Sequence, residues 1–191
     1  EPASVSEITF MNFKIDGNAH VRTKPTSEWR SYNIHVCGKP QLRIFGVTSV
    51  NSPIDCFCTR YKRPFELSEN ESVWVKVVNC HFEDAYRNTL SLVSGNSISF
   101  VNCEILGGGF VHGGTNPRYC LDIEPTSGDS RLHARNIKFT NCTFARAINA
   151  VVGGTWGQAD FIGCTIDASY KHPLNVSKVG YPWAFTLSSL G

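Results

Sequence analysis

Short segments in which apolar and polar residues alternate recur along this chain, and every segment has the same internal order. The shared pattern is apolar, any residue, apolar, any residue, Asn or Gly, Cys or apolar, any residue, apolar. Residues 98–105 (ISFVNCEI) and 137–144 (IKFTNCTF) both fit it. Four further copies occupy residues 8–15, 42–49, 75–82 and 159–166. The copy at 42–49 lacks the last apolar position. Six copies in one chain indicate a repeat architecture.

The pattern inside each copy predicts two very short strands joined by a sharp bend. Alternation with a period of two is typical of strands, and no stripe with a helical period runs through these segments. Asn and Gly adopt the left-handed backbone conformation most easily, so each marks a bend. A single bend residue does not fit a two-residue hairpin turn. The sequence therefore predicts an all-β solenoid of the parallel β-helix type, with about six to seven coils.

Stacking the copies places equivalent residues in columns along the solenoid axis. A second family of strands is expected at residues 54–57, 89–93, 120–124 and 147–151, giving three strands in each coil. The expected turn column, in which Asn amides can bond along the axis, is Asn12, Gly46, Asn79, Asn102, Asn141 and Gly163. The expected inward column is Phe13, Val47, Cys80, Cys103, Cys142 and Cys164.

The eight cysteines allow three interpretations. A disulfide framework is not needed in a chain of 191 residues. A zinc site is not supported either, because only one residue separates Cys56 from Cys58 and no second ligand pair follows at finger spacing. Buried free thiols in the inward column fit best.

Composition narrows the function classes. A single domain over residues 1–191 is expected, and because the chain starts at Glu1 without Met it could be a piece of a longer protein. A net charge of +2 argues against a nucleic-acid partner. No apolar run is long enough to predict a membrane-spanning helix.

Candidate chemistry lies around residues 120–124, because long turns flank this strand alone: 106–119 before it and 125–136 after it. Leu121 and Ile123 should point inward, so Asp122 and Glu124 should both face solvent on one side of the strand. Two strand residues span about 6.5–7 Å, near the carboxyl separation of inverting glycosidases. We therefore interpret Asp122 and Glu124 as the catalytic acid and base of a glycoside hydrolase. The alternative is a pair of solvated surface acids, or a pair that binds arginines of the loops.

Other side chains are candidates for substrate binding around that pair. Asp84 and Arg87 form a second, weaker candidate for the catalytic carboxylate. Ser91 and Asn149 should flank Asp122 on the adjacent coils. The remaining candidates come from the flanking loops and from the turn after residue 152: His112, Arg118, Tyr119, Arg131, His133 and Trp156.

The repeated units, the opening ITFMNFKIDGN and the run LDIEP resemble right-handed parallel β-helix proteins of the pectate-lyase-like superfamily, and bacteriophage tailspikes among them. The resemblance covers residues 6–170. It implies a polysaccharide substrate from a bacterial surface, endo-acting depolymerisation, a homotrimer, and a place on the virion or, alternatively, secretion. No metal or other cofactor is expected. A polysaccharide lyase using His112, Arg118 or Tyr119, and a non-catalytic receptor-binding or structural solenoid, are the alternatives, because this fold hosts many functions.

Overall fold

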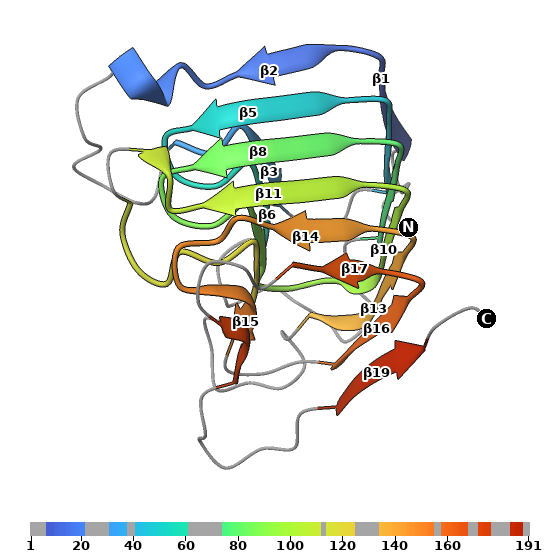
Figure 1. Cartoon of the computed structure of the whole chain (residues 1–191). Helices are drawn as coiled ribbons and strands as arrows, with labels where there is room; N and C mark the ends of the chain where they lie inside the picture. Colours follow the sequence, from blue (N-terminus) through green and yellow to red (C-terminus); the bar gives the residue numbers. More distant parts are fainter. Residues whose placement is uncertain are drawn as a thin grey trace, which may run out of the picture.

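The chain folds into a right-handed parallel β-helix built from three parallel sheets (Figure 1). The computed structural model describes residues 7–21, 31–37, 41–60, 74–111, 114–124, 134–154, 158–167, 172–176 and 184–188. In this part of the chain the one helical element is a short 3₁₀ turn, Ala19–Val21, and no helix is long and apolar enough to cross a membrane. The predicted fold class is confirmed.

Each sheet collects one strand from each successive coil. The first sheet contains β1 (Glu7–Met11), β4 (Gln41–Phe45), β7 (Trp74–Val78), β10 (Asn96–Val101), β13 (Arg135–Thr140), β16 (Gln158–Ile162) and β19 (Ala184–Ser188). The second contains β2 (Lys14–Asp16), β5 (Thr48–Ser52), β8 (His81–Ala85), β11 (Glu104–Gly108), β14 (Thr143–Ala145) and β17 (Thr165–Ile166). The third contains β3 (Ile34–Cys37), β6 (Phe57–Arg60), β9 (Leu90–Leu92), β12 (Leu121–Ile123), β15 (Ala150–Gly154) and β18 (His172–Val176).

The repeated motif forms the corner between the first and second sheets. In all six copies the Asn or Gly at the bend has a positive φ, from 51° at Asn141 to 60° at Gly163. The side-chain amide of Asn102 donates to Oδ1 of Asn79 at 3.3 Å, so neighbouring bends are also linked along the axis. The predicted turn column is confirmed, and its geometry explains the residue choice.

The interior holds two ladders of stacked side chains. Phe139 is fully buried, and its ring stacks on Phe100 and on Phe161 with centroids 5.1 Å apart in both cases. Cys80, Cys103, Cys142 and Cys164 are free thiols on successive coils. The sulfur of Cys80 accepts the backbone N–H of Val47, and that of Cys164 accepts the backbone N–H of Cys142, both at 3.4 Å. The prediction of a thiol ladder without disulfides is confirmed.

The inward column is less covered at its two ends. Phe13 is 38% exposed and Cys164 is partly exposed, whereas Val47 is fully buried. Phe13 precedes β2 and Cys164 precedes β17, and these two strands are the edges of the second sheet. The expectation of a buried Phe13 is therefore wrong, because a neighbouring coil covers this column on one side only.

The strands of the third sheet lie later in the sequence than expected in two of the coils. The strand expected at 147–151 is β15 at Ala150–Gly154, and the one expected at 54–57 is β6 at Phe57–Arg60. β9 and β12 lie inside their expected ranges. The shift of three residues in β15 changes which side chains lie next to Asp122.

Candidate functional site

Asp122 and Glu124 project from the outer face of the third sheet, but only one of them is open to solvent. Leu121 and Ile123 pack in the core, so the residues between and after them point outward. Asp122 is 3% exposed, whereas Glu124 is exposed. The expectation that both carboxyl groups face solvent is therefore wrong for Asp122, whose surroundings on the outer face cover it.

The immediate neighbours of Asp122 are Ser91 and Gly153 on the adjacent coils. The register of β12 pairs Asp122 with Ser91 of β9 and with Gly153 of β15. A Cβ atom on Gly153 would lie 2.3 Å from Cε2 of Tyr119, so the Tyr119 ring occupies the space that a side chain would fill there. The ring therefore lies beside Asp122 on the outer face. The structure therefore places Ser91 and Tyr119 next to Asp122.

The surroundings of Asp122 favour its neutral form. Burial raises the pKa of this carboxyl group well above its usual value, and the negative charge of Glu124 raises it further. Arg87 opposes these effects. Hydrogen bonding between the two carboxyl groups acts in the same direction.

A buried ion pair lies behind this site. Asp55 is fully buried, and the guanidinium of Arg87 binds it through both arms, Nε to Oδ1 at 3.1 Å and Nη2 to Oδ2 at 2.6 Å. The backbone N–H of Asn88 also donates to Oδ1 of Asp55, at 3.0 Å. The side chain of Asn88 in turn donates to Oδ2 of Asp122 at 2.9 Å. Sequence reasoning missed Asp55 and Asn88, which lie 33 and 34 residues from their partners.

Two predicted binding residues, Asn149 and Arg118, contact other parts of the chain. Asn149 precedes β15, and its amide donates to Oδ1 of Asn116 at 3.2 Å and to the carbonyl of Pro117 at 2.7 Å. Gly153 occupies the position expected for Asn149. The side chain of Arg118 packs along Gly109, where any Cβ atom would lie 2.6 Å from it. His112, Arg131, His133 and Trp156 lie outside the described residues.

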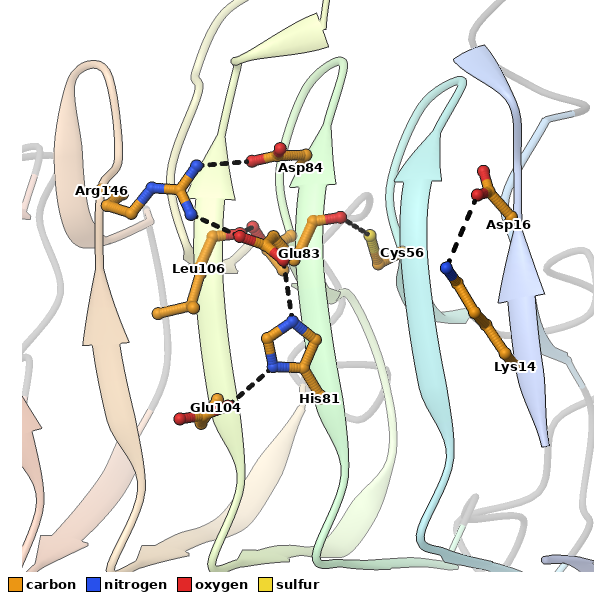
Figure 2. Close-up of polar contacts among 10 residues, drawn as sticks. Lys14, Asp16, Cys56, His81, Glu83, Asp84, Glu104, Leu106 and Arg146 are labelled. Carbon is orange, nitrogen blue, oxygen red and sulfur yellow. Dashed lines mark hydrogen bonds and ion pairs between the residues drawn. The ribbon is translucent and has the colours of Figure 1, made fainter. Parts of the chain in front are cut away.

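A second polar cluster lies on the outer face of the second sheet (Figure 2). His81 of β8 contacts two carboxylates, Nδ1 to Oε2 of Glu104 at 2.7 Å and Nε2 to Oε2 of Glu83 at 2.9 Å. Arg146, which follows β14, binds Glu83 and also Oδ1 of Asp84 at 3.2 Å. These contacts join three successive coils, so the cluster ties the outer face of the sheet together.

Asp84 belongs to this second cluster and not to the Asp122 site. Asp84 lies in β8, whereas Arg87 lies between β8 and β9 and binds Asp55. Partial burial raises the pKa of Asp84, and Arg146 opposes that effect. A Cβ atom on Gly107 would lie 2.2 Å from Oδ1 of Asp84, so this glycine makes room for the carboxyl group. The expectation that Asp84 and Arg87 form one site is wrong, because they separate at the corner between two sheets.

Among the described residues, no group of three or more His, Cys, Asp or Glu side chains is arranged to hold a metal ion. The arrangement at Asp122 places a buried carboxyl group with a raised pKa two residues from an exposed one. No protein-family model matches this chain, and no curated protein or solved structure matches it significantly. The parallel β-helix is thus established by the architecture alone.

Proposed function

We propose that this chain is a carbohydrate-active β-helix that hydrolyses a bacterial surface polysaccharide, with Asp122 as general acid and Glu124 as general base. The observation that carries the proposal is the contrast within the pair. Asp122 is buried with a raised pKa, while Glu124, two residues later, is exposed. A carboxylic acid that stays protonated beside an ionised carboxylate is the combination that glycoside hydrolysis uses.

The proposed step consumes one water molecule and restores both groups. Asp122 gives its proton to the glycosidic oxygen as the bond to the anomeric carbon breaks, and Glu124 takes a proton from the water that attacks this carbon. The sugar oxygen replaces Glu124 as the hydrogen-bond partner of Asp122, and the exposed Glu124 side chain turns toward the water. Afterwards the proton returns from Glu124 to Asp122 through the hydrogen bond they share, because burial gives Asp122 the higher affinity for it.

The test uses amide variants and a panel of purified bacterial capsular and O-antigen polysaccharides, with cleavage followed by size-exclusion chromatography and reducing-end release. We expect Asp122→Asn and Glu124→Gln each to slow cleavage by about 10²–10⁴-fold. Asp160→Asn, on the first sheet, is the matched control and should retain the wild-type rate. Wild-type rates in both amide variants would overturn the assignment, and products that absorb in the ultraviolet from a new double bond would identify a lyase.

One observation favours a second function, which is binding without cleavage. The 3% exposure of Asp122 is low for a group that must reach a sugar oxygen. In a non-catalytic receptor-binding solenoid, Asp122 and Asn88 would simply stabilise the stack. Polysaccharide binding measured by calorimetry, together with unchanged polymer length, would establish this function.

The tailspike-like repeat units also support a proposed location and oligomeric state for the protein. A polysaccharide depolymerase of this kind acts outside the cell or on a phage tail, and homotrimers are common in the proteins it resembles. Light scattering on the purified chain tests the trimer: a mass three times the 21.2 kDa of one chain is expected, and a monomer would overturn that part of the proposal.

A further inference from the structure

Asn88 is a fully buried asparagine at the centre of the polar network behind Asp122. It lies two residues before β9, on the coil adjacent to β12. Its side chain contacts three groups: Nδ2 donates to Oδ2 of Asp122 at 2.9 Å and to Oγ of Ser91 at 3.2 Å, and Oδ1 accepts the backbone N–H of Tyr119 at 2.9 Å. Every hydrogen-bonding group of this amide therefore has a partner.

The contact with Tyr119 determines the orientation of the Asn88 side-chain amide, that is, which of its ends carries the oxygen. A backbone N–H can only donate, so the atom of Asn88 that faces Tyr119 must be the oxygen. The amide nitrogen then faces Asp122 and Ser91 with its two hydrogens. The opposite orientation would place N–H against N–H at Tyr119 and leave Asp122 facing an oxygen.

This orientation determines the state of each oxygen of Asp122. Oδ2 accepts a hydrogen from Asn88, and in a neutral carboxyl group the unprotonated oxygen is the stronger acceptor. The hydrogen bond therefore favours a proton on Oδ1, the oxygen that does not accept from Asn88. The ion pair between Asp55 and Arg87 holds the backbone of this segment, since Asp55 also accepts the N–H of Asn88.

We propose that Asn88 is a positioning residue for the acid–base pair: it keeps Oδ2 of Asp122 as an acceptor and so places the transferable proton on Oδ1. The catalytic part of this inference rests on the proposed function, whereas the placement of the proton does not. Because a donor to a carboxylate favours its ionised form, Asn88 also limits how strongly Asp122 holds its proton.

The experiment compares wild type, Asn88→Ala and Thr89→Val. Thr89 is also fully buried, and its hydroxyl donates to the carbonyl of Leu106 at 2.8 Å, away from Asp122. Thr89→Val therefore removes a neighbouring buried hydrogen bond as a matched control. The titration of Asp122 is followed by NMR of ¹³C-labelled aspartate carboxyl groups, assigned with Asp122→Asn, and the pH dependence of kcat is measured on a cleaved polysaccharide.

We expect Asn88→Ala to move the titration midpoint of Asp122 upward and to shift the alkaline limb of the kcat profile the same way. The value of kcat should fall by roughly 10²-fold with KM little changed, because the acid is no longer held in place. Thr89→Val should lose a comparable amount of thermal stability and leave the midpoint and the limb where they are in the wild type. Equal midpoints in Asn88→Ala and Thr89→Val would overturn the proposal.

A second variant covers the case in which Asn88→Ala does not fold. Asn88→Asp has nearly the same shape and can still accept the N–H of Tyr119, but it presents an oxygen without a hydrogen to Asp122. The midpoint of Asp122 should then rise further, and an unchanged midpoint would contradict the proposed orientation. If the wild type cleaves no polysaccharide while these midpoints move as expected, the hydrolase proposal fails and the role of Asn88 in placing the proton stands.

Discussion

Asp122 and Glu124 lie two residues apart on the same face of one strand, yet the first is buried and the second is exposed. The difference in exposure comes from neighbouring parts of the chain, because the Asn88 amide donates to Asp122 and the Tyr119 ring lies beside it. A carboxyl group in such a place is easier to keep neutral than to ionise. Its effect on stability should therefore depend on pH.

Asp122→Asn should become more stable than the wild type as the pH rises. The folded-state pKa of Asp122 lies above the usual value of 3.8. Its contribution to folding is therefore fully present below about pH 3.8 and is lost as the pH rises through the folded-state pKa. The amide stays neutral throughout. Melting temperatures measured by calorimetry from pH 4 to 8 should diverge in favour of the variant, and a constant deficit at every pH would contradict this.

The cluster on the second sheet should stabilise the fold in a defined pH window. Both ring nitrogens of His81 contact carboxylate oxygens, an arrangement that needs a proton on each nitrogen. The pKa of His81 is raised by these contacts, although burial opposes them, and the hydrogen bond with His81 lowers that of Glu83. The His81 contribution is present below about pH 6.5 and is lost above its raised pKa; the Glu83 contribution is present above about pH 4.5 and is lost below its lowered pKa.

His81→Gln should therefore lower the melting temperature most near pH 5–6, between the two usual pKa values, and by less at pH 8–9. The surrounding charged groups are Glu83, Asp84, Glu104 and Arg146, with His20 on the 3₁₀ turn and the Lys14–Asp16 pair two strands away on β2. His20→Gln, at an exposed position, serves as the control for losing one histidine. A His81→Gln effect that is the same at pH 5 and pH 9 would contradict a charged imidazole.

The backbone at Asn102 predicts a difference between two substitutions. Its φ is 52°, in the left-handed region, where Ala is strained by about 1–2 kcal/mol and Gly is not. Asn102→Ala should therefore be less stable than Asn102→Gly by about that amount in urea unfolding. Both variants lose the hydrogen bond to Asn79. The difference between them therefore measures the free-energy cost of the left-handed backbone conformation. Equal stability would mean that the bend at this corner can relax.

Cys37 should be the thiol that reacts first in the native protein. It is exposed, and its sulfur lies 3.1 Å from Nε2 of His35, whereas seven other cysteines are buried or partly buried. Partial burial raises the pKa of Cys37, so the reaction should quicken with pH. Titration with Ellman's reagent should show one fast thiol in the native protein and eight in denaturant. In Cys37→Ser the fast phase should disappear, and its persistence would contradict the buried ladder.

The corner between the first two sheets could be predicted from sequence because its cause is local. At Asn79 or Gly163 the residue type itself selects the positive φ, and the alternating neighbours select the strands. The register of the third sheet has no such local marker. In β15, Gly153 resembles a turn residue, but it stands in the strand because the Tyr119 ring takes the place of its side chain. A sequence pattern does not contain this long-range contact, and it therefore predicts Asn149 opposite Asp122 in place of Gly153.

The burial of Asp122 could not be predicted for a similar reason. A strand pattern shows which residues point outward, but it does not show what lies over them. The Asn88 amide and the ion pair between Asp55 and Arg87 come from earlier coils, with 32 to 34 residues between partners. Only the folded arrangement brings these polar groups together.

The pairing order of the strands has a consequence for how the molecule comes apart. Among the described residues, the strands of each coil pair with those of the coil before and the coil after it. The free energy of folding is therefore approximately a sum over single coils and the interfaces between neighbouring coils. Opening should start at a terminal coil such as that of β1, where Ile8 and Phe10 are 41% and 38% exposed, and progress one rung at a time. The strand of Asp122 is paired on both sides, so unfolding of a coil at either end leaves this strand in place. Amide hydrogen exchange at Asp122 should therefore be slow, since it requires the later opening of the central coils.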